Sequence, residues 1–332
     1  MTSSSSTEFR QLGSHGPKVF PIALGCMGMS GMYGATDETE SIATIHEALD
    51  RGISLLDTGD FYGTGLNEML IGRALQGRRN QALVSVKFGA LRAPDGGWIG
   101  YDARPVAVKN FLAHSLHRLG VDQIDIYRPA RLDPAVPVED TMGAIAEMIK
   151  AGYVRYAALS EVGVDTIRRA VAVAPIVDLQ IEYSIISRGP EAAIFPALDE
   201  MGIAVTAYGV LSRGLLSGSK PQAKGDFRAH MPRFAADNLA QNQRLVDTLG
   251  AIAAEKGVTA VQLATAWVLG RGRNIIPVMG ARTRAQLRET LAALDLTLSV
   301  DELTRIAEAV PAAAVAGTRY APAQMKTLDS ER

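Results

Sequence analysis

Short apolar runs alternate along the chain with longer amphipathic stretches. The runs are bounded by turn residues, which is the pattern of buried parallel strands. They predict strands at residues 22–25, 53–56, 83–87, 123–127, 154–159, 177–181, 204–207 and 275–277. The amphipathic stretches predict helices near 36–51, 67–75, 105–119, 138–151, 165–173, 191–201, 238–256 and 284–294. Repeated strand–helix units predict a parallel sheet, and eight of them close a (β/α)8 TIM barrel.

The ends of the chain add elements to this barrel. Turn residues at Gly13 and Gly16 separate two short strand-like runs, which predicts an N-terminal β-hairpin over residues 8–23. Residues 300–310 predict an extra C-terminal helix. We expect a single domain over residues 1–332, flexible at 1–7 and about 312–332. An open doubly wound sheet is the alternative, but no Gly-x-Gly-x-x-Gly follows an early strand.

Three polar residues lie where predicted strands end. Asp57 follows one strand directly, Tyr62 comes five residues later in a glycine-rich loop, and Lys87 ends the next strand. The carboxyl ends of barrel strands converge on one face. A nearby ammonium lowers the pKa of a phenol, and a carboxylate holds that ammonium charged. The group suits protonation of a carbonyl oxygen, although an ion pair beside a surface tyrosine is the structural alternative.

Bulk properties exclude several classes of protein. The net charge is −1, so nothing indicates a nucleic-acid partner. No apolar run reaches the length of a membrane span, and the polar N-terminus is unlike a signal peptide. The single cysteine, Cys26, excludes an internal disulfide framework and is compatible with a reducing compartment. We expect a cytoplasmic protein without a metal site, and the oligomeric state stays open.

Several motifs together resemble the aldo-keto reductase family. They are Leu-Asp-Thr-Gly-Asp-Phe-Tyr-Gly at residues 56–63, Asn67-Glu68, Val86-Lys87, and Leu-Gly-Cys-Met-Gly-Met-Ser at residues 24–30. The resemblance covers roughly residues 8 to 310. It implies NADPH-dependent reduction of an aldehyde or ketone to an alcohol, with Asp57, Tyr62 and Lys87 as the catalytic residues.

The resemblance also implies a set of cofactor-binding residues. These are Met27 and Gly28 after the first strand, Ser160, Glu161 and Gln180 at the nicotinamide amide, Tyr208 stacked on the nicotinamide ring, Gly209, Leu211, Arg213, Gly214 and Leu215 over the pyrophosphate, and Gly280, Arg282, Gln286, Glu289 and Thr290 at the adenosine. Arg282 before a helix N-terminus suits a 2′-phosphate and favours NADP over NAD. The structural alternatives are a buried amide, a helix N-cap and solvated arginines.

One stretch departs from the family pattern. The family usually has Gln-His-Arg-x-Asp-Pro after the fourth strand, and here Ala130 falls on the catalytic histidine. Of the five histidines, only His230, in a long loop, could reach this position. Arg128 has the same strand parity as Ala130 and could point inward. Either Arg128 or His230 could therefore replace the missing histidine.

The space left by the missing imidazole predicts a bulky or cyclic ketone as substrate. The candidate substrate-binding residues are Tyr33, Trp98, Arg128 and Ala130. Two long connections, at residues 89–101 and 209–234, are candidate lids over the same face. The alternative function is a non-catalytic or weakly active cofactor-binding regulatory subunit, or a redox sensor, on the same fold.

Overall fold

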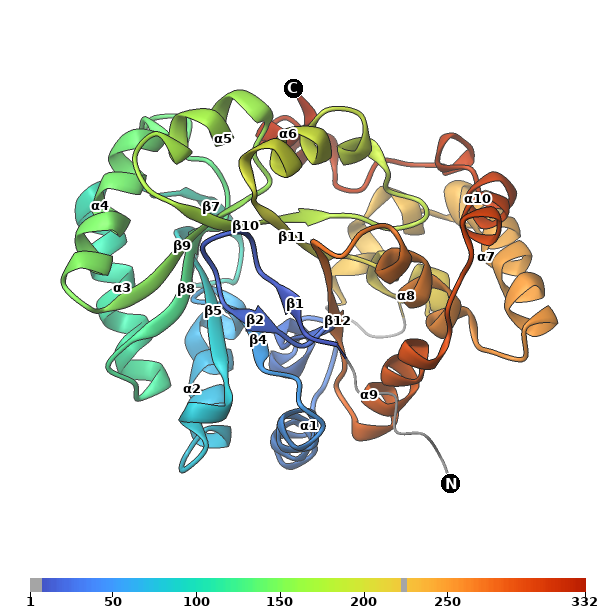
Figure 1. The fold of residues 1–332 in the computed structure, drawn as a ribbon, viewed down its shortest axis with the longest axis horizontal. Coiled ribbons are helices and arrows are strands. Elements are labelled where there is room, and N and C mark those ends of the chain that lie inside the picture. The colour runs from blue at the N-terminus through green and yellow to red at the C-terminus, as the bar shows by residue number, and fades with distance from the viewer. Residues whose placement is uncertain (1–7, 222–225) are drawn as a thin grey trace.

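The computed structural model describes residues 8–221 and 226–332. Eight parallel strands close into a barrel in the order β10-β11-β12-β3-β4-β5-β8-β9 (Figure 1). Their bounds are β3 Ala23–Gly25, β4 Leu55–Gly59, β5 Leu83–Phe88, β8 Ile124–Pro129, β9 Val154–Ser160, β10 Ile176–Glu182, β11 Ala204–Tyr208 and β12 Ile275–Gly280. The predicted (β/α)8 barrel is confirmed.

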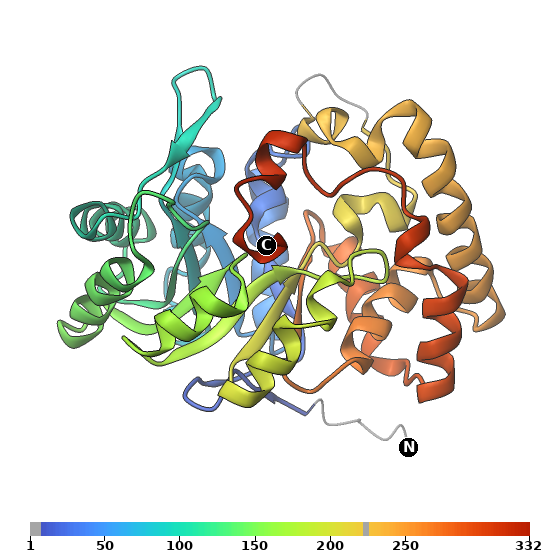
Figure 2. The same cartoon turned by 90° about the horizontal axis from the view of Figure 1, so that it is seen from above.

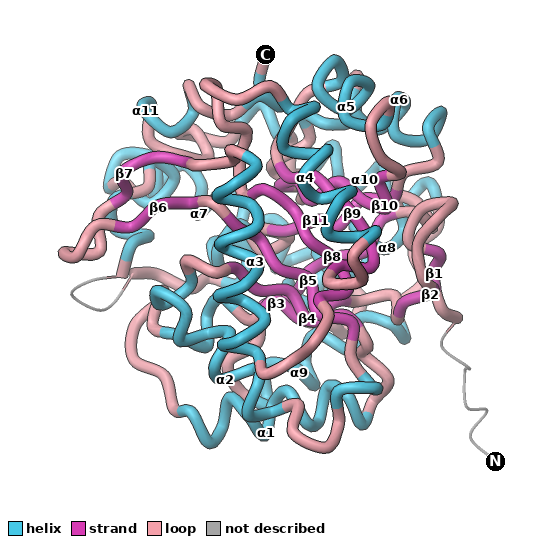
Figure 3. Tube along the Cα trace, turned by 90° about the vertical axis from the view of Figure 1, so that its left-hand side faces the viewer, coloured by secondary structure: helices cyan, strands magenta, loops and turns pink. Residues whose placement is uncertain are grey.

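Helices surround the barrel and bury its strands. Every residue of β4 and β10 is buried, as expected for parallel strands covered on both faces. Figure 3 shows helices outside the strands, and α2 packs against α3 while α3 packs against α4. The bounds are α1 Glu38–Asp50, α2 Leu66–Ala74, α3 Pro105–Leu119, α4 Val138–Lys150, α5 Val164–Val171, α6 Ile194–Met201, α7 Ala236–Glu255, α9 Arg284–Leu291 and α10 Val300–Ala309.

Helix α8, Ala260–Gly270, was not predicted from the apolar pattern. Its residues from Leu263 to Val268 are all buried, so it has no polar face to produce a helical period. The sequence did contain another signal. Thr259 and Gln262 form a capping box, a recognisable mark of a helix N-terminus.

The N-terminal hairpin closes the floor of the barrel. Strands β1, Arg10–Gln11, and β2, Lys18–Val19, pair antiparallel, as predicted. Leu12 and Val19 pack in one buried cluster with residues of the barrel strands. The Arg10 guanidinium donates to the carbonyl oxygens of Leu269, Gly272 and Ile275, which ties the hairpin to the barrel. The hairpin thus fills one end of the barrel, and the opposite end, where the strands have their carboxyl ends, is available for a functional site.

The first long connection forms a second hairpin. Strands β6, Ala90–Arg92, and β7, Trp98–Tyr101, pair antiparallel and project from the barrel (Figure 2). In the second connection, the basic side chains of Arg228 and Arg233 are buried. Lys224, another basic residue of this connection, lies outside the described residues. Residues 1–7, which were predicted to be flexible, also lie outside them.

The C-terminal tail lies across the mouth of the barrel (Figure 2). It contains a short helix, α11 Pro322–Met325, and buries Arg319 and Leu328. A buried ion pair joins Arg319 to Glu161, which follows β9, and holds this part of the tail against the barrel. The flexibility expected of residues 312–332 remains a prediction.

Two kinds of feature are missing from the part of the chain that the structure describes. None of its helices combines the length and apolar character needed to cross a membrane. It also contains no group of three or more histidine, cysteine, aspartate or glutamate side chains arranged to hold a metal ion.

Candidate active site

The predicted catalytic residues meet in one cavity at the carboxyl ends of the barrel strands. Asp57, Tyr62 and Lys87 all line this cavity, whose volume is about 1180 Å3. The Lys87 Nζ lies 2.6 Å from the Asp57 Oδ2 and 5.1 Å from the centroid of the Tyr62 ring. The other Asp57 oxygen accepts hydrogen bonds from Gln180, at 2.8 Å, and Ser85, at 3.2 Å. The barrel therefore fixes a buried acid–amine pair beside a phenol.

Strand register and a tight turn create this grouping. β4 and β5 are parallel neighbours, with Asp57 opposite Ser85 and Gly59 opposite Lys87. Beyond β4 the chain turns sharply, because Gly63, Thr64 and Gly65 all have left-handed backbone angles. Gly65 has φ +94°, a backbone conformation that side chains rarely adopt, so the turn favours glycine there. This turn places Tyr62 over the strand ends.

The motif residue Asn67 fastens the same turn to the barrel. Its side-chain amide donates to the carbonyl oxygen of Cys26, and its side-chain oxygen accepts from the Thr58 hydroxyl at 2.6 Å. Asn67 is fully buried. These bonds join the first two barrel strands to the start of α2.

The electrostatics keep Tyr62 protonated. Burial, and then the negative charge of Asp57, raises the pKa of the Tyr62 phenol well above its ordinary value. Burial lowers the pKa of Lys87, and Asp57 opposes that effect. The lowered Tyr62 pKa expected from the ammonium is not seen in this geometry, because burial and then the charge of Asp57 raise that pKa. A neutral phenol is nevertheless the form that can donate a proton.

One end of the cavity fits a phosphate. The residues predicted at the adenosine end and after the first strand line it, namely Met27, Gly28, Gly280, Arg282, Gln286, Glu289 and Thr290. A Cβ on Gly28 would lie 3.2 Å from Arg282 and 3.3 Å from Tyr33, so glycine lets these groups approach. Arg282 makes no ion pair with any described residue and precedes the capped N-terminus of α9. A guanidinium without an ion-pair partner among the described residues suits an anion such as a 2′-phosphate.

The segment after β11 also borders the cavity. Five of the residues predicted to contact the cofactor line it, namely Tyr208, Gly209, Leu211, Arg213 and Gly214. However, the Arg213 guanidinium donates to Glu182 at 3.0 Å, so its charge is already balanced. Leu215, which was predicted to cover the pyrophosphate, is buried in the hydrophobic core and does not line the cavity.

Ser160 and Glu161 also do not line the cavity, unlike Gln180. Glu161 is fully buried and accepts hydrogen bonds from Arg319, Ser330 and the Tyr208 hydroxyl. Burial raises the pKa of Glu161, but Arg319 more than reverses this and holds that pKa at about 2. The tail therefore engages the carboxylate that was predicted to bind a nicotinamide amide. The Ser160 hydroxyl is buried without a hydrogen-bond partner among the described residues.

Arg128 points into the barrel but does not line the cavity. It is fully buried, lies 2.6 Å from Asp178 and donates to Ser85 at 2.9 Å. Strand alternation turns both Arg128 and Ala130 inward, yet Arg128 is held by its carboxylate partner and only Ala130 lines the cavity. The structure thus places Arg128 in a buried ion pair and not on the cavity wall beside Ala130.

The remaining substrate-side predictions lie on the cavity wall. Tyr33, Trp98 and Ala130 line it, and exposed His230 lies at its rim. The Phe61 ring packs edge-on between Tyr62, at 4.7 Å, and Trp98, at 5.5 Å. The β6–β7 hairpin thus supplies aromatic surface close to the Tyr62 phenol.

Sequence reasoning missed two residues on this side. Arg131 donates to the Tyr320 hydroxyl at 3.0 Å, and Tyr320 lies 2.8 Å from the Tyr208 hydroxyl. Both line the cavity. The signal for Arg131 was its place directly after Ala130 in the altered motif. Tyr320 had no local signal, because only the fold brings the tail over the barrel.

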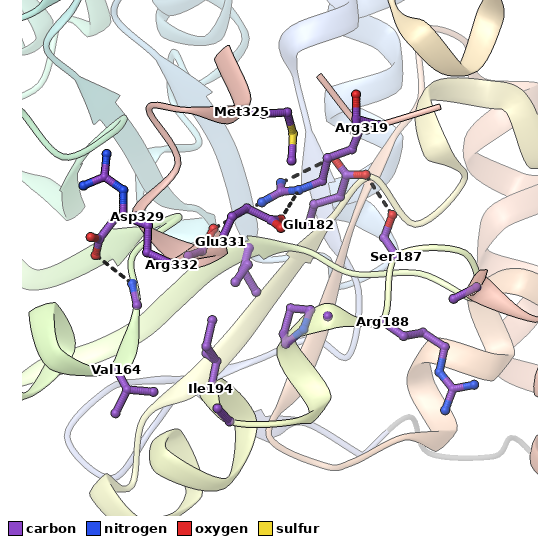
Figure 4. A pocket seen from close by; sticks show the side chains of 18 of the residues that line it. Val164, Glu182, Ser187, Arg188, Ile194, Arg319, Met325, Asp329, Glu331 and Arg332 are labelled. Atoms are coloured by element: carbon purple, nitrogen blue, oxygen red, sulfur yellow. Dashed lines mark hydrogen bonds and ion pairs between the residues drawn. The ribbon is translucent and has the colours of Figure 1, made fainter. Parts of the chain in front are cut away.

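A second cavity, of about 790 Å3, lies between the tail and the starts of α5 and α6. Figure 4 shows Arg319 next to Glu182 on its wall. Arg319 lies 3.7 Å from Glu182 and 2.8 Å from Glu331, and Asp329 accepts a hydrogen bond from the Gly163 amide. These contacts fasten the tail between the two cavities.

Comparisons with known proteins agree with this geometry. Residues 21–311 match the sequence model of the Aldo/keto reductase family. The chain is 38% identical to "Probable aldo-keto reductase 1" of Glycine max, over 93% of this chain and 91% of that protein. It is 37% identical to the Schizosaccharomyces pombe aldo-keto reductase yakc, whose name specifies NADP(+), over 91% of each chain.

Solved structures give the same result. The glycerol dehydrogenase AKR11B4 from Gluconobacter oxydans superposes with a TM-score of 0.83 at 27% identity, covering 96% of this chain and 98% of that one. The family match extends over the strands that carry Asp57 and Lys87 and over the turn that carries Tyr62. With this barrel, this buried group and this extent of sequence similarity, the chain belongs to the aldo/keto reductase family.

Proposed function

We propose that this protein uses NADPH to reduce a bulky or cyclic ketone reversibly to an alcohol. Its family membership makes it an NADP-dependent oxidoreductase acting on carbonyl groups. The observation that carries the proposal is that Asp57, Tyr62 and Lys87 line the same cavity as Arg282, the residue suited to a 2′-phosphate. We also propose a cytoplasmic location.

Each residue has a defined task in this reaction. Arg282 and Gln286 would hold the adenosine end of the cofactor, and the bound cofactor would supply a hydride. The Tyr62 hydroxyl donates its proton to the carbonyl oxygen, and its raised pKa keeps that proton available. Lys87 places a positive charge near the phenol, and the 2.6 Å contact with Asp57 holds that ammonium in position.

The preference for a bulky ketone rests on Ala130. A methyl group lies where the family pattern has an imidazole, and Ala130 is 2% exposed at the cavity wall. Trp98 and Tyr33 supply aromatic surface for a larger substrate. Burial of that substrate contributes about 25 cal/mol for each Å2 of apolar surface.

The test of this preference is Ala130→His. The ratio of kcat/KM for a bulky ketone to that for a small aldehyde is measured in the wild type and the variant. We expect the added ring to speed reduction of the small aldehyde and to block the bulky ketone. An equal increase for both substrates would show that the space has no role in selection.

Tyr62→Phe tests the reaction itself. The variant lacks the proposed proton donor, so turnover should be lost while NADPH affinity stays nearly unchanged. Both are measurable on one preparation, by NADPH oxidation and by protein fluorescence. Turnover within a few-fold of the wild type would place the proton donor elsewhere.

The second candidate function is a cofactor-binding regulatory subunit or redox sensor, which the absence of the histidine favours. Such a protein would bind NADPH without consuming it. An NADPH-oxidation assay over a panel of aldehydes and ketones separates the two functions, since only the reductase oxidises NADPH with some member of the panel.

A further inference from the structure

We infer that Arg131 binds a carboxylate of the substrate, so that the preferred ketone also carries an acid group. This inference rests on the proposed carbonyl reduction and specifies its substrate class. Arg131 directly follows Ala130 at the end of β8 and lines the cavity together with Tyr62 and Lys87.

The first observation is that Arg131 has no carboxylate partner among the described residues. Its guanidinium donates to the Ala130 carbonyl oxygen at 2.6 Å and to the Tyr320 hydroxyl at 3.0 Å. These bonds use two of the five N–H donors that a guanidinium carries. A partly buried cation with spare donors is suited to bidentate recognition of a carboxylate.

Other cations on the cavity wall differ in this respect. Lys87 is paired with Asp57, Arg213 with Glu182, and Arg228 with Asp226. Glu182 is also shared with Arg233 and Arg319, whereas no carboxylate of the described residues lies within ion-pair distance of Arg131. The cavity therefore favours a ligand that brings a negative charge to this position.

A second cation without an ion pair among the described residues reinforces this preference. Arg92, on the β6–β7 hairpin, lies 4.4 Å above the Trp98 ring and lines the same cavity. Its Nε is buried without a hydrogen-bond partner among the residues described. An anion entering beside Trp98 thus meets positive charge from the hairpin and from β8.

The charge of Arg131 also reaches the catalytic groups. Burial raises the pKa of Tyr62, and Arg131 opposes that increase. Burial lowers the pKa of Lys87, and Arg131 adds to that decrease. Since Arg131 lines the same cavity as Tyr62 and Lys87, one ketone acid in that cavity can meet Arg131 with its carboxylate and Tyr62 with its carbonyl oxygen.

A purely structural role is the competing explanation, because Arg131 also holds Tyr320 of the tail. Tyr320→Phe separates the roles, since it removes the hydroxyl that Arg131 contacts but leaves the guanidinium. Arg131→Met removes the charge and keeps much of the side-chain volume. Comparing these variants distinguishes recognition of an acid from anchoring of the tail.

The substrates are 2-, 3- and 4-acetylbenzoate, each with its methyl ester, which keeps the ketone and removes the charge. kcat/KM is measured by NADPH oxidation in the wild type and both variants. We expect the wild type to prefer at least one acid over its ester. Arg131→Met should lower kcat/KM for that acid by about ten- to a hundredfold and for the ester by less than about threefold. Tyr320→Phe should leave the acid-to-ester ratio unchanged.

Two results would overturn the inference: an equal loss for acid and ester in Arg131→Met, or the same change of ratio in Tyr320→Phe. A binding measurement keeps the test independent of turnover. The affinities of benzoate and benzamide for the NADP+-loaded protein are compared by protein fluorescence. Tighter binding of benzoate that depends on Arg131 supports the acid site even if no ketone is reduced, in which case only the proposed function fails. Turnover of neutral ketones without acid preference or benzoate binding contradicts the inference alone.

Discussion

Two buried carboxylates at the mouth of the barrel have opposite electrostatic surroundings. Glu161 follows β9 and is fully buried, whereas Asp60 follows β4 and is 7% exposed. Burial raises the pKa of Glu161, but Arg319 reverses the effect and holds that pKa at about 2. Burial, and then the charge of Glu68, raises the pKa of Asp60 to about 7.

The difference lies in which segment covers each acid. The C-terminal tail brings Arg319 onto Glu161, while the nearest cation on the other side, Arg118, lies 2.6 Å from Glu68 rather than beside Asp60. The two acids therefore give stability opposite dependences on pH. Glu161 contributes stability above pH 4.5 that is lost as pH falls toward 2. Asp60 contributes stability below pH 3.8 that is lost as pH rises toward 7.

The largest expected effect comes from removing the cation beside Glu161. Arg319→Met leaves a buried carboxylate without its partner, which costs about 3–5 kcal/mol in the free energy of unfolding. It should also speed amide hydrogen exchange over the tail. Urea denaturation and exchange mass spectrometry measure the two effects.

Two further variants control this experiment. Arg332→Met removes an exposed arginine of the same tail and should change stability by no more than about 0.5 kcal/mol. Adding Glu161→Gln to Arg319→Met removes the orphaned charge and should restore part of the loss. A loss in Arg319→Met no larger than in the surface control would contradict the role assigned to this pair.

A smaller effect is expected from Asp60→Asn, which removes the acid that lacks a cation. On account of Asp60, the wild type should lose about 2–4 kcal/mol of stability between pH 4 and pH 7. The amide does not ionise, so the variant should show a flatter decline. Denaturant midpoints at several pH values measure this decline. Asp50→Asn, which replaces an exposed acid, is the control. If Asp60→Asn and the wild type decline in parallel, Asp60 is not the titrating group.

The same comparison shows what the sequence could and could not predict. Asp57 and Lys87 were predictable because each lies near the carboxyl end of an apolar strand, and the two strands, β4 and β5, are parallel neighbours. Tyr62 followed from the glycine-rich turn. The ion pair between Glu161 and Arg319 was not predictable, because 158 residues separate them and only the folded tail brings them into contact. Arg128 was expected to point inward, but its partner Asp178 lies on β10, which the sequence pattern does not place opposite it.

Arg282 gives the smallest expected effect and extends the comparison from acids to arginines. Arg319 is paired and buried, while Arg282 is partly exposed and has no ion pair within the described residues. Removal of Arg282 should therefore leave stability unchanged and weaken only a bound anion. We expect the wild type to bind NADPH more tightly than NADH, and Arg282→Ala to lose about 1.5–3 kcal/mol of NADPH affinity without a change for NADH.

Arg284→Ala is the matched control for this prediction. Arg284 begins the same helix, α9, but its guanidinium is 2.9 Å from Glu40, so its charge is already used within the protein. Fluorescence titration of both cofactors on the three proteins measures the difference. Equal wild-type affinities for NADPH and NADH would remove the case for a 2′-phosphate site. A loss in Arg284→Ala as large as in Arg282→Ala would show that NADPH senses the general positive charge of α9, and that an unpaired arginine has no special role there.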